Sequence, residues 1–286
     1  ARFGTRLAAD PHTGGTVIVL FGTGMLVVGI GFKLALFPFH MWTPDVYQGA
    51  PAPVAGFVAA VSKTAVVAAL VRLFAPAALT ANPSLFRVFW LVVAASMVGG
   101  NLLALKQRSV KRILAYSSIA HMGYLLVAFT AGGSDSAQAV AFYLTAYTIT
   151  IIGAFGIVAV LSGPDGDADD LADFKGLALS HPWLGGIFTA MLLSLAGIPL
   201  TAGFVGKFYL VVTGLHSALW WLVMILLLTS GIGLYYYLRI IVTLFSRSEE
   251  PHTPVQRAPD IGFSGGMALA AVTILLIWLG IGPEPL

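Results

Sequence analysis

The 286-residue chain contains no cysteine. Without thiols it can form no disulfide and can hold neither a thiolate metal site nor an iron–sulfur cluster. Charged residues are also scarce: they make up 9% of the chain, against about 25% in a soluble domain. Because 58% of the residues are hydrophobic, a soluble globule of this composition could not cover its surface. We therefore predict an all-α, polytopic transmembrane helix bundle.

The motifs of many soluble enzymes are missing as well. The chain has no P-loop, no GxSxG elbow and no GxGxxG after a strand, and its six histidines do not show metal-ligand spacing. No basic patch is interleaved with aromatic residues, so we predict no nucleic-acid partner. We expect no cofactor or metal to be bound by this chain. The net charge of +3 is interpreted as loop lysines and arginines that face anionic lipid.

A membrane helix needs about 20 mainly apolar residues. Eight segments of the chain meet this requirement, and we expect residues 1–286 to form a single membrane domain. The chain starts ARFGTRLAAD, with neither Met nor a signal peptide, so we expect further helices upstream. The predicted spans are 16–37, 54–74, 85–105, 113–131, 137–161, 183–212, 218–245 and 263–281.

The distribution of basic residues predicts the orientation. The loop KQRSVKR (106–112) carries four positive charges, which indicates the cytoplasmic side. Alternation of the spans then places 38–51, 162–181 and 246–262 on that side as well. The acidic segment 162–181 is predicted to be a surface loop that ends in a short amphipathic helix.

Three lysines lie inside apolar spans: Lys33, Lys63 and Lys207. A charge at the centre of a bilayer costs about 2.5–3.5 kcal/mol, and its usual purpose is a path for protons or ions. Burial disfavours the ammonium form, and a nearby carboxylate favours it, so such a lysine can take up and release protons. Lys33 could instead snorkel to the interface. Snorkelling is hard for Lys63 at mid-span, and a buried ion pair is hard to sustain for Lys207, because no predicted span has an acidic residue at its middle.

Two of these lysines accompany proline-marked interruptions. Lys33 precedes Pro38, and Lys207 follows Pro199 in the sequence AGIPLTAG. Proline removes a backbone donor and clashes with the preceding turn, so we expect discontinuous helices at both places, while Lys63 lies in an unbroken span. Paired broken helices point to the ion site of a transporter. A structural repeat and ordinary glycine-rich packing both remain open as explanations of the local similarity.

Two spans also carry polar faces. Ser117, His121 and Tyr124 share one face of the fourth span, and Tyr147 lies in a similar row on the fifth, with Tyr143 and Thr150 at helical spacing. Hydrogen bonding between helices accounts for the hydroxyl groups. For His121, a proton relay and a structural hydrogen bond are equally open.

Three motifs in order resemble the antiporter-like membrane subunits of respiratory complex I, and most closely their N-type (NuoN) group. The resemblance covers nearly the whole chain. The motifs are GFKLALFPFHMWTPDVYQGAPAPVAGFVAAVSK (31–63), NLLALKQRSVKRILAYSSIAHMGYLLVAF (101–129) and SLAGIPLTAGFVGKFY (194–209).

The resemblance implies a fourteen-helix fold with two inverted five-helix repeats, of which this chain would be helices seven to fourteen. Lys33, Lys63 and Lys207 match the family's lysines on helices seven and eight and its charged residue on broken helix twelve. His121 matches a histidine in the helix-ten region. The family's glutamate on helix five, the partner of the helix-seven lysine, lies outside this sequence.

The function implied is that of a proton-translocating subunit of NADH:quinone oxidoreductase in the bacterial plasma membrane. Quinone reduction elsewhere in the complex would drive protons through the lysine and histidine relay. FMN, iron–sulfur clusters, NADH and quinone would bind other subunits. The implied partners are the lipid bilayer, a neighbouring M-type subunit and small K-, J- and A-type subunits. The alternatives are an Mrp-type cation/proton antiporter subunit, the membrane arm of an energy-converting hydrogenase, and a purely structural scaffold.

Overall fold

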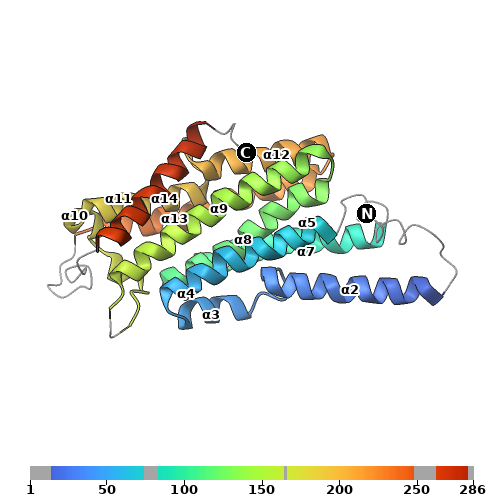
Figure 1. The fold of residues 1–286 in the computed structure, drawn as a ribbon, viewed down its shortest axis with the longest axis horizontal. Helices are drawn as coiled ribbons and strands as arrows, with labels where there is room; N and C mark the ends of the chain where they lie inside the picture. The colour runs from blue at the N-terminus through green and yellow to red at the C-terminus, as the bar shows by residue number, and fades with distance from the viewer. Residues whose placement is uncertain (1–13, 74–82, 164–165, 248–261, 283–286) are drawn as a thin grey trace.

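The computed structural model of the chain describes residues 14–73, 83–163, 166–247 and 262–282 (Figure 1). Its named elements are all helical, and the only β-structure within these ranges is two isolated bridges, so the predicted fold class is confirmed. In chain order the elements are α2 (Gly14–Leu34), α3 (Trp42–Gly49), α4 (Ala52–Phe57), the π-helix η1 (Val58–Ser62), α5 (Lys63–Leu73), α7 (Pro83–Leu105), α8 (Val110–Ala131), α9 (Ser134–Leu161), the 3-10 helix η2 (Leu171–Phe174), α10 (Leu177–Ser180), α11 (Pro182–Ala196), α12 (Ala202–His216), α13 (Trp220–Phe245) and α14 (Phe263–Ile281).

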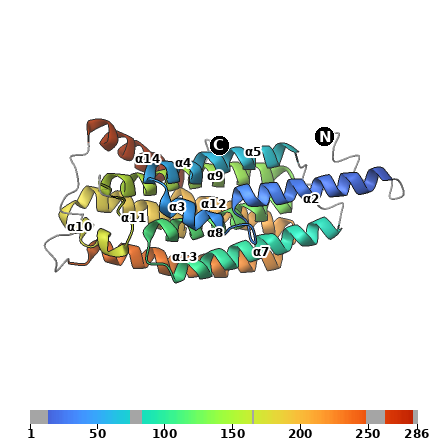
Figure 2. The same ribbon diagram turned by 90° about the horizontal axis from the view of Figure 1, so that it is seen from below.

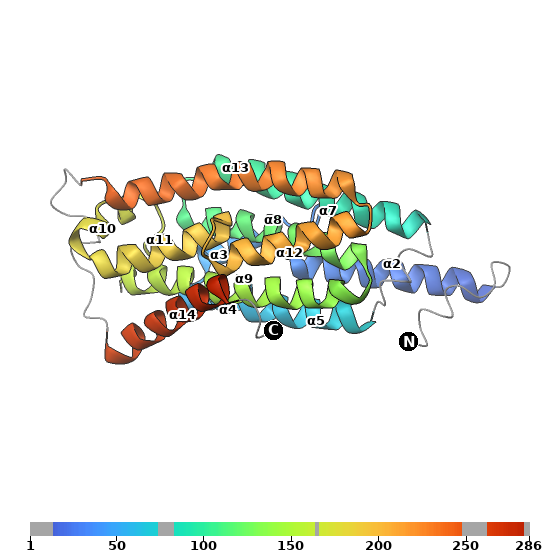
Figure 3. The ribbon, with the colours of Figure 1, turned by 90° about the horizontal axis from the view of Figure 1, so that it is seen from above.

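The long helices run side by side along the long axis of the bundle, with α8 at its centre (Figures 2 and 3). Helices α3, α7, α9, α12 and α13 all pack against α8, whose apolar stretch is completely buried. Small residues allow the closest of these approaches. A Cβ added to Gly100 of α7 would lie 2.8 Å from the backbone nitrogen of Ala120, and one added to Gly123 would lie 3.0 Å from that of Met97. Such close packing of small residues is typical of membrane helices.

Six helices of the described chain are long and apolar enough to cross a membrane. They coincide with six of the eight predicted spans, and their ends lie within a few residues of the predicted limits. For example, Val110–Ala131 corresponds to the predicted span 113–131. The other two predicted spans, 16–37 and 183–212, are interrupted, as expected from Pro38 and Pro199. The six candidate spans are Ala52–Arg72, Phe86–Leu105, Val110–Ala131, Asp135–Leu161, Trp220–Phe245 and Ser264–Ile281.

The first interruption follows Lys33. Helix α2 ends at Leu34, and Ala35 adopts a positive φ of 60°. The segment 38–51, predicted to connect two spans on the cytoplasmic side, is mostly helical, because α3 occupies most of this range and buries three of its residues in the bundle (Thr43, Pro44 and Tyr47). The side on which it lies stays a prediction. A proline and Asp45 in the first turn favour a helix start here, and only the break at Pro38 was recognised from the sequence.

The span that contains Lys63 is continuous but not regular. It consists of α4, a five-residue π-helical stretch and α5, and Lys63 is the first residue after that stretch. Such π-bulges widen the helix and frequently occur at functional sites. The expectation of an unbroken span is confirmed, but the local change of pitch beside the lysine was not predicted.

The second interruption separates α11 from α12. Helix α11 ends at Ala196, and both Gly197 (φ 82°) and Leu200 (φ 73°) take left-handed backbone conformations before α12 begins at Ala202. Glycine adopts this conformation without steric cost, and Pro199 cannot continue the helix. The predicted discontinuity is therefore confirmed.

Segments predicted to share one side of the membrane meet at one end of the bundle. Lys111 Nζ donates to the carbonyl of Ala50, and the backbone nitrogen of Val110 donates to the carbonyl of Asp169. The backbone nitrogen of Gly176 likewise donates to Thr243 near the end of α13. The predicted short helix of the acidic segment is α10, and most of the predicted loop 246–262 lies outside the described residues. That this end is cytoplasmic stays a prediction.

Candidate functional site

The centre of the bundle holds two of the three predicted lysines together with the predicted histidine. Lys63 is 1% exposed, His121 is 3% exposed and Lys207 is 8% exposed, so all three are buried although they are polar. They come from three elements, α5, α8 and α12, with α8 in the middle. Buried polar groups need hydrogen-bond partners, and these partners define the site.

Lys63 is held by hydroxyl groups. Its Nζ donates to Ser118 Oγ of α8 at 2.5 Å, and Ser118 Oγ is 2.6 Å from the hydroxyl of Tyr147 on α9. The ring of Tyr47 on α3 lies 5.9 Å from the same Nζ, within the range of a cation–π contact. The ammonium of Lys63 is therefore surrounded by neutral groups.

His121 lies between two tyrosines of different helices. Its Nδ1 is 2.7 Å from the hydroxyl of Tyr143 on α9, and its Nε2 is 3.2 Å from the hydroxyl of Tyr237 on α13. The ring centroid of Tyr147 lies 5.5 Å from that of His121. Since imidazole and phenol can each donate and accept, this row of groups can pass a proton in either direction.

Lys207 is held by the broken helix itself. Its Nζ donates to the carbonyls of Leu195 (3.0 Å) and Ala196 (2.8 Å), and to Ser230 Oγ (2.8 Å). The last carbonyls of a helix have no partner within that helix and carry its negative end of the dipole. Ending α11 at Ala196 leaves these two oxygens free for the lysine. Gly197 permits the approach, because a Cβ there would lie 2.7 Å from Lys207 Cδ.

His121 and Lys207 both line a small cavity. The cavity volume is about 10 Å³, close to the minimum for one water molecule. The polar groups around it could provide the two to four partners that a buried water needs. The lining residues are His121, Tyr143, Ala146, Tyr147, Thr150, Ser194, Leu195, Gly203 and Lys207.

Lys33 does not join this cluster. It lies in the last turn of α2, its side chain is exposed on the chain, and none of the described residues forms a hydrogen bond or ion pair with it. The break beside it is closed by Trp42, whose Nε1 donates to the carbonyl of Phe32 at 2.9 Å. In the part of the chain that the structure describes, no carboxylate lies within ion-pair distance of Lys33, Lys63 or Lys207.

The supporting residues chosen from the sequence take different positions. Tyr147 is part of the Lys63 site, and the ring of Tyr124 lies 5.3 Å from Lys207 Nζ. The hydroxyl of Ser117 donates to Leu114 in its own helix, while the neighbouring Ser118 contacts Lys63. Pro38 and Pro199 lie in the two interruptions.

Several contacting residues were not selected from the sequence. Besides Ser118 they are Asn101, Ser194, Ser230, Tyr236 and Tyr237. The buried amide of Asn101 links α7, α8 and α13: its Nδ2 is 2.7 Å from the hydroxyl of Tyr124, and its Oδ1 accepts from Tyr236 at 3.0 Å. A run of three tyrosines in the middle of an apolar span was the available signal for α13.

The family model described as NADH:quinone oxidoreductase/Mrp antiporter, TM, matches residues 7–233. The chain belongs to this family. It is 49% identical over 284 residues to NADH-quinone oxidoreductase subunit N of Ectopseudomonas mendocina (strain ymp), covering 98% of this chain and 57% of the relative. The NADH:quinone oxidoreductase/Mrp family resemblance inferred from the three motifs is therefore confirmed.

Two solved structures show the same fold. A chain of respiratory complex I from Thermus thermophilus with bound aureothin is 37% identical, with a TM-score of 0.81, 99% of this chain covered and 64% of that chain covered. A chain of the Mrp complex from Dietzia sp. DQ12-45-1b is 22% identical, with a TM-score of 0.81 and coverage of 99% and 59%. The present chain thus spans a little over half the length of the curated relative that it matches.

Proposed function

We propose that the chain is part of an N-type, proton-translocating subunit of NADH:quinone oxidoreductase in a bacterial plasma membrane. The identities of 49% with a subunit N and 37% with a complex I chain support this choice within the family. The 22% identity with the Mrp chain supports only a common fold, which makes cation/proton antiport the second candidate.

The observation that carries the proposal is the buried cluster of Lys63, His121 and Lys207 at the centre of the helix bundle. A proton on Lys63 can pass through Ser118 to Tyr147 along hydrogen bonds of 2.5 Å and 2.6 Å. One water in the cavity would connect Tyr147 and His121 with Lys207, since all three line it. The relay needs no redox group in this chain.

Electrostatics provides the driving force. Positive charges within one buried cluster repel one another, so a proton added at one end favours release at the other. Moving one charge across 100 mV costs about 2.3 kcal/mol, which is within the range of about 1–3 kcal/mol typical of coupling between sites. The relay therefore needs no unusual coupling strength.

Lys33 would receive the signal from the rest of the complex. Its exposed position at the break leaves room for a carboxylate of an upstream helix. Quinone reduction on other subunits, which would also hold NADH, FMN and the iron–sulfur clusters, would move this charge pair. M-type and small K-, J- and A-type subunits would be the neighbours in the membrane arm.

The test replaces Lys63 or Lys207 by Ala in the full-length subunit and measures NADH-driven proton uptake into inverted membrane vesicles. Uptake should fall on the order of tenfold or more, because the relay loses a proton-carrying group. The matched control is Lys106→Ala, which removes an exposed lysine from the loop after α7. Full pumping in both relay variants would show a structural scaffold. Sodium transport independent of NADH oxidation would favour the antiporter.

A further inference from the structure

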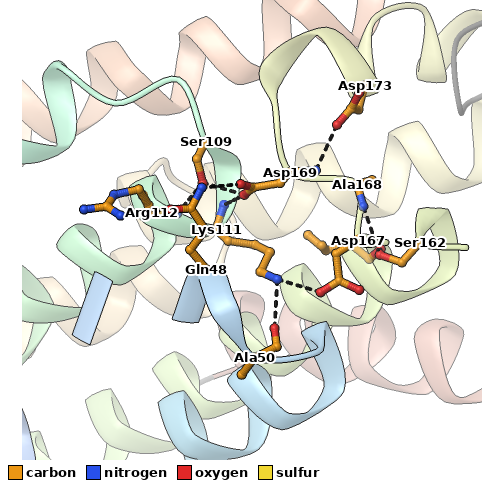
Figure 4. Close-up of polar contacts among 11 residues, drawn as sticks. Gln48, Ala50, Ser109, Lys111, Arg112, Ser162, Asp167, Ala168, Asp169 and Asp173 are labelled. Atoms are coloured by element: carbon orange, nitrogen blue, oxygen red, sulfur yellow. Dashed lines mark hydrogen bonds and ion pairs between the residues drawn. The ribbon is translucent and has the colours of Figure 1, made fainter. Parts of the chain in front are cut away.

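A third buried lysine of the described chain, Lys111, lies outside the relay. It was predicted only as a loop charge that sets orientation, but α8 already begins at Val110 and its side chain is 2% exposed. Its Nζ donates to Asp167 Oδ2 at 2.6 Å and to the carbonyl of Ala50 at 2.8 Å (Figure 4). Unlike Lys63 and Lys207, Lys111 is thus paired with a carboxylate.

The two contacts of Lys111 Nζ join three segments that are distant in the sequence. Ala50 is the junction between α3 and α4, Lys111 is in the first turn of α8, and Asp167 precedes η2 (Figure 4). Beside it, the carboxylate of Asp169 accepts from Gln48 Nε2 at 2.6 Å and also from Ser109 and the backbone of Lys111. Together these bonds link the segments that meet at one end of the bundle.

This end of the bundle is adjacent to the Lys63 site along α8. Lys111 and Ser118 are seven residues apart on the same face of α8, which corresponds to about 10 Å along the helix. Ala115 lies between them and is completely buried. Tyr47 of α3 also connects the two places: it precedes Gln48, which bonds to Asp169, and its ring contacts Lys63 Nζ. Two helical turns therefore separate the ion pair from the relay.

We propose that the Lys111–Asp167 pair is a latch that closes this end of the bundle to water and opens to admit protons toward Lys63. The inference rests on the proposed relay. A buried ion pair is a weak source of stability compared with apolar packing, so stability alone does not explain it. Asp167 follows Gly166, whose φ of 145° is open to glycine alone, and is 20% exposed, so this partner is in place to swing toward water.

The absence of cysteine from the chain allows a direct test of access. Ala115→Cys is introduced into the full-length subunit, and its reaction rate with a small, water-soluble thiol reagent is measured in membranes, with the parent complex as background. The reaction should be slow at rest and faster during NADH turnover. Adding Asp167→Asn or Lys111→Met should raise the resting rate at least tenfold, and the exchange Lys111→Asp with Asp167→Lys should restore part of the protection.

The matched control is Lys106→Met, an exposed lysine of the same loop, which should leave the resting rate unchanged. If the Lys111→Met variant does not assemble, the resting labelling rate of Asp167→Asn tests the latch, because this change is nearly isosteric. A resting rate in Asp167→Asn equal to that of the parent, or a fast rate in the parent itself, overturns the latch. Because labelling does not require pumping, it separates failure of the latch from failure of the relay, which the Lys63 and Lys207 variants test.

Discussion

Removal of one hydroxyl group tests the relay most sharply. Ser118 Oγ is the described link between Lys63 Nζ, at 2.5 Å, and the hydroxyl of Tyr147, at 2.6 Å. A hydrogen bond to a charged group contributes about 1.5–3 kcal/mol and a neutral one about 0.5–1.5 kcal/mol, so Ser118→Ala removes about 2–4.5 kcal/mol. The proton must cross both bonds, so we assign this loss to the transition state for transfer. At about 1.36 kcal/mol per tenfold in rate, transfer from Lys63 should then slow by about 30-fold to about 2,000-fold.

A water molecule that takes the place of the hydroxyl would move the effect to the lower end of this range. The assay is the initial rate of NADH-driven proton uptake by inverted vesicles, normalised to assembled complex on native gels. Ser136→Ala is the matched control. It removes another buried serine hydroxyl, bonded to Ala128 and far along α9 from Tyr147. Uptake in Ser118→Ala equal to that in Ser136→Ala would refute the role of this hydroxyl.

Two further predictions concern the packing that holds the relay. Gly203→Ala should destabilise the subunit by about 1–3 kcal/mol or more, since the new Cβ would lie 1.9 Å from the carbonyl oxygen of Ser194. The amount of this variant in the membrane should fall. The control Gly186→Ala, whose new Cβ would meet no atom within 4 Å, should leave the amount of subunit in the membrane unchanged. Asn101→Leu should cost about 1–3 kcal/mol, because the hydroxyls of Tyr124 and Tyr236 each lose their hydrogen bond to the amide. A thermal-unfolding assay would detect this loss, and an unchanged unfolding temperature would contradict the assignment.

The positions of the spans and of both breaks could be predicted because they depend on local properties. Runs of apolar residues define membrane helices, and Pro38 and Pro199 interrupt the hydrogen-bond ladder wherever the helix packs. The helix α3 was missed because its eight residues are too few and too polar for a span, although three of them are buried in the bundle. Burial of such a segment depends on its neighbours and not on its own hydropathy.

The contacts within the site could be predicted only in part, for a related reason. Helical spacing shows that residues share a face, but it does not show which neighbouring helix that face meets. Ser117 and Ser118 are adjacent serines that the sequence does not distinguish. Only the arrangement of the helices in the bundle selects Ser118 as the partner of Lys63. Lys111 was assigned to a loop for the same reason, because its carboxylate partner lies 56 residues away.

The partners of the buried lysines divide them into two kinds. Lys63 and Lys207 are bound by hydroxyls and helix carbonyls, which stay neutral when the amine loses its proton. Lys111 is bound by the carboxylate of Asp167, so its positive charge is matched by a negative one across the contact. Neutral partners therefore suit a lysine that must exchange protons, whereas a carboxylate suits one that must hold its charge and keep two segments together.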